Sequence, residues 1–407
     1  MTRRSGSADL PLHGGHVPRW LAVRMERLGR VIVEAIALEY GRREVLRRLS
    51  HPFWFQSFGA VMGMDWHSSG ITTSVLGALK RGLRPVEEEL GIHVCGGRGK
   101  ASRQTPAELV AVGERTGLDG ESLARTSRRV AKVDSAAVQD GFELYLHGFI
   151  VDDEGGWVVV QQGMRPEIKK ARRYHWSSET VRSFVEAPHT AIEGEPGQPI
   201  LNLTDRAAAA ARSAQVELVR EGPETVLREL RKIRPRAASA QLALPHLELP
   251  DHHDVRPEDV VERRLGGAIL AARERGPVDF ADVLDTPGVG ARTVRALALV
   301  AEVVHGAPSR FSDPARFSFA HGGKDGHPFP VPLRVYDRTL SVLRDAVTRA
   351  KLGEDDRMAA LRRLDAEARA LEQTVVRVDV EGLLAAEREA SPTLGGRTVF
   401  GWSRPIE

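Results

Sequence analysis

The sequence predicts an α+β protein, in which an N-terminal mixed domain with a small β-sheet precedes an all-helical C-terminal domain. Two runs of β-forming residues, 142–151 and 157–161, flank the turn sequence Asp152–Gly156 and indicate a β-hairpin. Beyond residue 257, apolar residues recur only at helical spacing. The length of 407 residues suits two or three domains.

Composition shifts divide the chain into four predicted segments. Residues 1–200 form an α/β domain. Residues 201–257 hold a charged helical stretch at 205–234, which we expect to be a solvated surface, and then a proline-rich linker. A helical domain over 258–389 and a tail over 390–407 complete the chain.

Individual elements follow from periodicity and capping signals. The first helix is predicted over 18–40, because its apolar residues recur every three or four positions. A short strand is expected over 92–95, and mixed loop and short helix over 166–200. The other predicted helices are 42–49, 72–81, 106–116, 119–132, 258–274, 278–284, 291–304, 336–352 and 355–373.

Composition permits a nucleic-acid partner without requiring one. The net charge is only +3, but most of the 58 basic residues are arginine, whose planar fork suits phosphate. A GC-rich genome would explain the arginine content equally well. The single cysteine, Cys95, excludes a disulfide within the chain and fits a reducing cytoplasm. Neither a secretory signal nor a membrane span is expected.

A glycine turn lies between two predicted helices in the second half of the chain, at Pro287-Gly288-Val289-Gly290. The two glycines allow backbone angles that are closed to other residues. Such a turn presents backbone N–H groups at the start of the next helix, where unpaired donors and the helix dipole attract anions. Val289 is expected to fill the gap between the helices, beside Leu284 and Val294.

This segment resembles the helix-hairpin-helix of many DNA repair proteins, which implies binding to the DNA backbone with weak sequence specificity. Arg292 and Arg295 are expected to reach flanking phosphates, and Lys324 to extend the contact. An ordinary turn between two core helices is the alternative. In the glycosylase superfamily that shares the hairpin, a catalytic aspartate follows it. Asp313 is the nearest candidate here, although a role as a helix cap explains its context better.

Polar residues in and before the predicted hairpin suggest phosphodiester chemistry. Strand alternation places three of them on one face of the sheet, and a residue of the partner strand is expected on the same face. Two aspartates are expected beside this face. Carboxylates supply the hard oxygen ligands that Mg²⁺ or Mn²⁺ prefers, and histidine supplies a base. A solvated sheet face is the alternative. The face comprises Glu143, Tyr145, His147 and Gln161, and the aspartates are Asp134 and Asp140.

We therefore expect catalytic roles for Asp134, Asp140, Glu143 and His147, with the three carboxylates as metal ligands. We expect the glycine-rich segment Gly96–Lys100 to clamp phosphate through Arg98 and Lys100. It lacks the spacing of a nucleotide P-loop. An ordinary flexible loop is the alternative for this segment.

Taken in order, these motifs resemble an uncharacterised prokaryotic family, known as domain of unknown function 763, almost from end to end. The resemblance implies one shared architecture in bacteria and archaea that ends in a helix-hairpin-helix. It carries no assigned function. The matching stretches are Arg4–Gly15, Trp66–Gly70, Gly96–Lys100, Asp134–Asp140, Gln161–Met164, Arg173–Trp176 and Gly322–Gly326.

Together these features predict a DNA-binding protein that acts in DNA repair or processing as a divalent-metal-dependent nuclease. One alternative is a helix-hairpin-helix glycosylase, which would need a catalytic acid such as Asp313 or Asp337 in the helical domain. Another is a non-catalytic DNA-binding scaffold.

Overall fold

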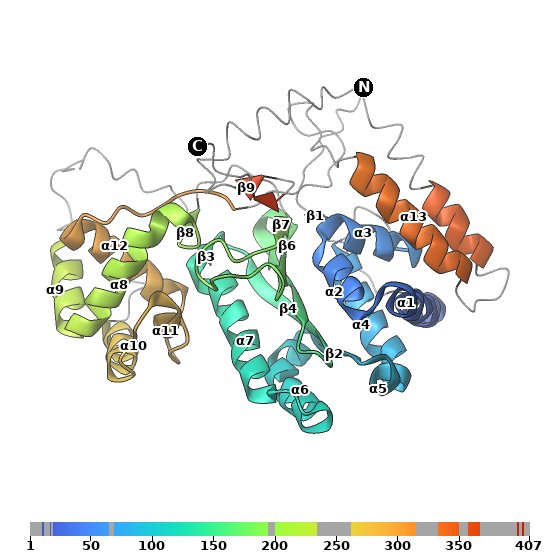
Figure 1. The fold of residues 1–407 in the computed structure, drawn as a ribbon. Coiled ribbons are helices and arrows are strands. Elements are labelled where there is room, and N and C mark those ends of the chain that lie inside the picture. Colours follow the sequence, from blue (N-terminus) through green and yellow to red (C-terminus); the bar gives the residue numbers. More distant parts are fainter. Residues whose placement is uncertain are drawn as a thin grey trace, which may run out of the picture.

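An antiparallel six-stranded sheet forms the centre of the computed structural model (Figure 1), in the order β1-β6-β5-β4-β2 with β7 paired to β6. The strands are β1 (Leu10–Pro11), β2 (Ile92–Arg98), β4 (Glu143–Asp152), β5 (Trp157–Arg165), β6 (Lys170–Ser177) and β7 (Ala191–Glu193). The structure describes residues 10–11, 17, 19–64, 69–193, 200–233, 262–314, 333–349, 357–366, 397–398 and 401–402. The predicted hairpin of β4 and β5 is confirmed, and so is the α+β class.

One face of the sheet packs on N-terminal helices. Its apolar side chains, such as Ile150 and Val158, share a core with Ile32 and Phe58 of those helices. The helices are α1 (Arg19–Tyr40), α2 (Arg42–Ser50), α3 (Pro52–Val61) and α4 (Gly70–Leu83), and the short α5 (Glu87–Leu90) precedes β2.

The C-terminal helical stretch divides between two cores. Helix α13 (Leu333–Arg349) returns to the N-terminal helices, because its apolar residues Leu343 and Val347 are buried in their core. Residues 357–366 are helical too, and Ala360 and Leu364 of this segment are buried in the same core. Figure 1 shows α13 beside α1 and α3, at the opposite end of the molecule from α8–α12.

The opposite face of the sheet packs on α6 (Lys100–Thr116) and α7 (Gly120–Lys132), and a second core continues from there into the helices of the other end. Phe149 and Trp176 of the sheet belong to the same buried cluster as Val289 and Leu297. The additional helices are α8 (Ala209–Glu221), α9 (Pro223–Ile233), α10 (Glu262–Glu274), α11 (Phe280–Leu284) and α12 (Ala291–His305).

Two sequence expectations for the middle of the chain are wrong. Residues 166–200 were expected to be loop and short helix, but they contain the central strand β6. The charged sequence of β6 does not look like a buried strand, because Arg172 and Arg173 are buried with partners inside the protein. Residues 205–234 are not simply a solvated surface, since Leu218 and Val219 of α8 lie in the core.

Two short strand pairs complete the architecture. One joins β3 (Val138–Gln139) to β8 (Leu201–Asn202), and the other joins β9 (Arg397–Thr398) to β10 (Gly401–Trp402). Within the described ranges, no helix has the length and apolar character that crossing a bilayer requires.

Candidate functional site

A cavity of about 860 Å³ opens between α6, α7, the first half of β4, the middle of β5, and the segment around the glycine turn. It therefore brings together residues separated by more than a hundred positions in the chain. The residues that line it are Ser102, Arg103, Pro106, Glu121, Arg125, Ser127, Arg128, Ala131, Lys132, Ser135, Leu144, Leu146, His147, Gln161, Arg275, Asp285 and Pro287.

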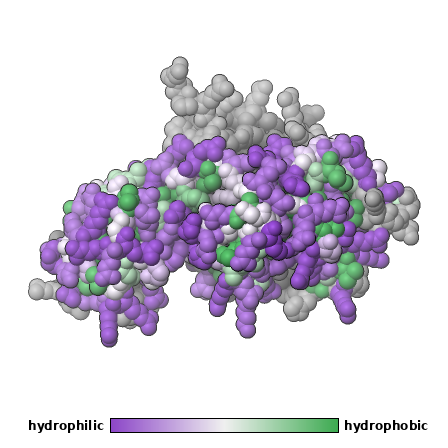
Figure 2. Space-filling model, turned by 60° about the horizontal axis from the view of Figure 1, so that its bottom comes forward, coloured by the Kyte–Doolittle hydropathy of each residue, from purple (hydrophilic) through white to green (hydrophobic). Residues whose placement is uncertain are grey.

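The cavity wall is strongly basic, with five cationic side chains against the two carboxylates of Glu121 and Asp285. Asp285 is in addition paired with the guanidinium group of Arg129. Figure 2 views the molecule from underneath and shows a predominantly hydrophilic face, with apolar residues in small separate patches. The cations are Arg103, Arg125, Arg128, Lys132 and Arg275, and all except the half-buried Lys132 are exposed.

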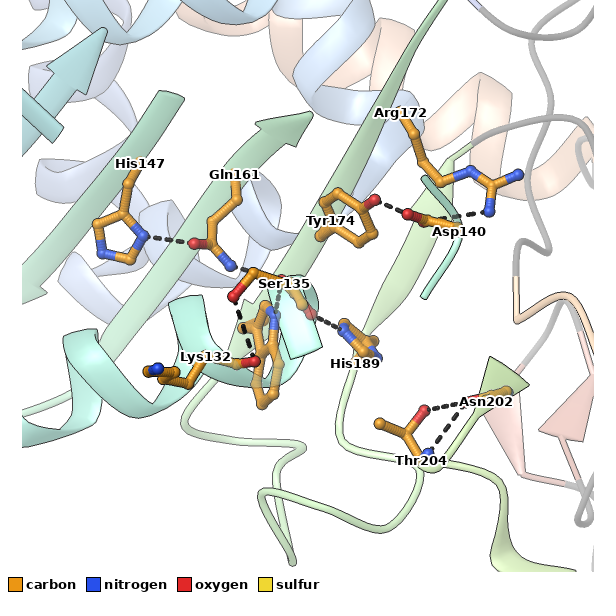
Figure 3. A network of polar contacts seen from close by, with 12 residues as sticks. Lys132, Ser135, Asp140, His147, Gln161, Arg172, Tyr174, His189, Asn202 and Thr204 are labelled. Atoms are coloured by element: carbon orange, nitrogen blue, oxygen red, sulfur yellow. Dashed lines mark hydrogen bonds and ion pairs between the residues drawn. The ribbon is translucent and has the colours of Figure 1, made fainter. Parts of the chain in front are cut away.

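A chain of hydrogen bonds begins at this wall and runs beneath the sheet. The Ser127 hydroxyl lies 2.8 Å from Nε2 of His147, and Nδ1 of His147 lies 2.6 Å from Oε1 of Gln161. The Gln161 amide nitrogen donates to the carboxylate of Asp134. Figure 3 shows His147 and Gln161 side by side on adjacent strands, where they are directly paired in register.

The chain of partners determines the tautomer of His147. Because an ionised carboxylate only accepts hydrogen bonds, Asp134 orients the amide NH₂ of Gln161 toward itself and its oxygen toward His147. Nδ1 of His147 must then carry the proton, which leaves Nε2 as an acceptor for the Ser127 hydroxyl. Burial lowers the pKa of His147, against smaller opposing effects of Gln161 and Asp134, so the ring is neutral near pH 7.

Asp134 is fully buried, and each carboxylate oxygen has a partner. Oδ2 also accepts a hydrogen bond from Nε1 of Trp176 at 2.9 Å, and Oδ1 pairs with Nε2 of His189. Asp134 lies in a π-helical turn, Val133–Ala137, which extends α7 and turns this side chain under the sheet. Such turns recur at functional sites.

Asp140 belongs to a second buried network. Its carboxylate accepts hydrogen bonds from the hydroxyl of Tyr174 at 2.6 Å and from the backbone N–H of Phe142 at 3.0 Å, and it lies 3.3 Å from Arg172 (Figure 3). Arg172 also binds both carboxylate oxygens of Asp313, each at 3.1 Å. Asp313 is therefore an ion-pair partner of a buried arginine. Its expected role as a helix cap stays a prediction, because the residues that follow Pro314 lie outside the described ranges.

The expected set of metal ligands is not assembled. Asp134 and Asp140 are held by different partners, and Glu143 is exposed at the start of β4. Among the described residues, no group of three histidine, cysteine or acidic side chains is placed to hold a metal ion. A dependence on Mg²⁺ or Mn²⁺ stays a prediction, but these three carboxylates do not share one site.

A bulge in β4 explains why the predicted polar face is only partly formed. The register with β5 shifts between Leu144 and Leu146, so that one residue is left over. Leu144 then packs on the core that lies on the His147 side of the sheet, whereas Tyr145 packs against the opposite core. His147 and Gln161 lie on one face of the sheet as expected, but Glu143 and Tyr145 do not join them.

The glycine turn joins α11 to α12 as the sequence predicted. Val289, Leu284 and Val294 are completely buried in one core. Gly288 has a φ of +88°, which favours glycine, but Gly290 has a φ of −142°, which any residue can adopt. The expectation that both glycines need special backbone angles is therefore right for Gly288 only.

Helix α7 and the short strand β3 hold the glycine turn in place. The Lys132 ammonium group donates to the carbonyl oxygen of Val289, and the Gln139 amide donates to that of Ala291 at 2.9 Å. Arg295 in turn donates to Oε1 of Gln139 at 2.7 Å. Arg295 thus contacts the protein itself. Arg292 is exposed at the start of α12.

The glycine-rich segment Gly96–Lys100 is mostly strand and not the expected loop. Gly96 lies in β2 with a φ of +86°, and a Cβ atom there would come within 2.2 Å of the carbonyl oxygen of His147. Glycine is therefore required by the close approach of β4. Arg98 and Lys100 are exposed beside the turn at Gly99, but neither lines the cavity. Lys324 lies outside the described residues.

A family profile described as "Protein of unknown function (DUF763)" matches residues 6–331. The chain belongs to this family. Comparison with curated proteins and with solved structures finds no match.

Ser127 and the basic side chains around it were not among the predicted site residues. Arg125, Arg128 and Lys132 recur at the helical spacing that places them on one side of α7. That periodicity was visible in the sequence. The position of Ser127 next to His147 was not, because it depends on how α7 packs against the sheet.

We predict that acid destabilises the protein as the pH falls below about 6.5. Burial lowers the pKa of His147, that of His175 far more, and that of His51 to about 4. The unfolded chain then takes up protons that the native state does not bind. For His51 alone, the shift from 6.5 to about 4 corresponds to roughly 3 kcal/mol of unfolding free energy, lost between those two pH values.

Denaturant titrations at a series of pH values measure this effect. His175→Gln retains an acceptor for the guanidinium group of Arg173, which donates to His175 at 2.9 Å, and should flatten the pH dependence. An unfolding free energy that stays constant from pH 7 to 5 would show that the native protein binds these protons after all.

Proposed function

We propose that this protein binds DNA through backbone phosphates in the basic cavity and hydrolyses phosphodiester bonds there, in DNA repair or processing in the cytoplasm. The observation that carries the proposal is the cavity itself, where five cationic side chains surround the Ser127–His147 pair. Arginine side chains bind phosphate oxygens through paired hydrogen bonds, and a cluster of them favours a polyanionic ligand.

The N-termini of two helices also favour the binding of phosphate in this cavity. The first turns of α6 contribute Ser102 and Arg103 to the cavity wall. Gly290 is the N-cap residue of helix α12 and provides no side-chain cap for the first N–H groups, and Pro287 of the same turn lines the cavity. Backbone donors at a helix start attract phosphate, and this is the role that the resemblance to helix-hairpin-helix proteins implies.

Support for cleavage comes from His147. A neutral imidazole with an unprotonated nitrogen toward the cavity can act as a general base. The neighbouring arginines would neutralise charge that develops on the phosphoryl group. A divalent metal, if the reaction uses one, needs ligands other than the three carboxylates considered above, and the DNA itself can supply some of them.

Reversing charge on the cavity wall should weaken DNA binding at every sequence tested. For Arg125→Glu/Arg128→Glu, we expect a Kd at least about 10-fold higher and a slope of log K against log salt that is smaller by about 2, because two phosphate contacts are lost. Fluorescence anisotropy over a range of salt concentrations measures both. Arg84→Glu/Arg264→Glu, at two exposed positions that do not line the cavity, is the matched control, and equal effects of both double variants would contradict the proposed interface.

Gly290→Asp should separate binding from stability. A Cβ atom at Gly290 meets nothing within 4 Å, and the backbone there is unstrained. An aspartate would cap α12 and raise the unfolding free energy by a few tenths of a kcal/mol, while its charge repels phosphate. We expect a slightly higher Tm and weaker binding. Unchanged DNA affinity would show that this helix start does not contact the backbone.

Cleavage is tested with labelled single-stranded, duplex and forked DNA in the presence of Mg²⁺, Mn²⁺ or EDTA. We expect products whose formation falls at least about 100-fold in His147→Gln, since a general base is lost. His305→Gln on α12 serves as the control. Salt-sensitive binding without products in any condition would favour the non-catalytic scaffold, and the EDTA samples decide whether a metal takes part.

A further inference from the structure

We propose that Ser127 is the nucleophile of this site and forms a phosphoseryl intermediate with the substrate. This inference rests on the proposed function, because it assumes a phosphodiester in the basic cavity. The observation behind it is the position of the Ser127 hydroxyl, 2.8 Å from Nε2 of His147, in a cavity wall that also carries Arg128 and Lys132.

Ser127, His147 and Gln161 are arranged in the way that activates a serine hydroxyl. A nucleophilic hydroxyl needs a base within hydrogen-bond reach, and the base needs a third group that holds its orientation. Here Ser127 donates to His147, whose other ring nitrogen donates to Gln161 at 2.6 Å. Asp134 binds the Gln161 amide from the far side. Gln161 and Asp134 thus act as positioning residues.

Burial favours this assignment over an ordinary surface hydrogen bond. Gln161 and Asp134 are completely buried, and Ser127 and His147 are only 2% and 5% exposed to solvent. All of them except Asp134 nevertheless line the cavity. Ser127 and Asp134 lie two turns apart on α7 and its extension, and both face the sheet. The serine is therefore held rigidly at the boundary between the protein interior and the cavity.

The reaction balances with the groups present and water. The Ser127 oxygen attacks phosphorus while its proton passes to Nε2 of His147. The bond from phosphorus to one ester oxygen breaks, and that oxygen takes the proton from His147. Water then attacks the phosphoseryl group, gives a proton to His147, and releases the Ser127 oxygen, which recovers the proton. The net change is hydrolysis of one phosphodiester bond.

The first test traps the serine in the full-length protein. We expect a fluorophosphonate–rhodamine probe to label the wild-type protein at Ser127, as peptide mass mapping would show, and denaturing gels to show a covalent adduct with fluorescein-labelled DNA. Ser127→Ala should lose labelling, and its cleavage rate should fall at least about 1,000-fold. Its Kd for DNA and its salt slope should stay those of the wild type. Ser122→Ala, on the same helix outside the cavity, should behave like the wild type.

The second test determines which ring nitrogen of His147 carries the proton. In ¹⁵N spectra of the wild-type protein, His147 should be the Nδ1-protonated tautomer, and Gln161→Leu should abolish this preference and slow probe labelling. An Nε2-protonated ring, or labelling that persists in Ser127→Ala, would overturn the assignment. Undiminished cleavage by Ser127→Ala would also overturn it while leaving the nuclease intact. DNA binding with neither labelling nor cleavage would reject the nucleophile and cleavage but preserve the interface, and failure to bind DNA would reject the proposed function itself.

Discussion

The buried carboxylate of Asp134 is the constraint around which the site is arranged. A charge removed from water is costly unless donors surround it, and Gln161, Trp176 and His189 supply them. Satisfying Asp134 fixes the amide orientation of Gln161 and, through it, the tautomer of His147. One electrostatic requirement beneath the sheet therefore decides that the nitrogen next to Ser127 carries no proton.

A second buried charge network ties distant segments together. Arg172 on β6 bridges Asp140, at the entrance to β4, and Asp313, beyond α12. On the other face of the sheet, Arg173 donates to Gln56 of α3 at 2.9 Å. Neighbouring arginines of one strand thus connect the sheet to both ends of the molecule, and such networks favour one arrangement because a mispaired buried charge is strongly destabilising.

Helix α7 links these internal requirements to the surface. Its inner face places Ser127 and Val130 against the sheet, its outer face carries Arg125 and Arg128, and its end holds the glycine turn through Lys132. The helix pair α11–α12 and the sheet therefore belong to one continuous core. The cavity exists because the glycine turn is docked on α7, and neither part forms it alone.

The sequence by itself determined the elements whose signals are local. Turn residues and β-forming runs located the β4–β5 hairpin, and the glycine turn located α11 and α12, with Val289 in the core. The tertiary structure alone decided the burial of β6, the shift of Tyr145 to the opposite face, the separation of Asp134 from Asp140 and Glu143, and the meeting of Ser127 with His147. The physical reason is that periodicity records which faces are apolar, whereas a buried polar residue is stabilised by partners far away in the chain, which no local pattern reveals.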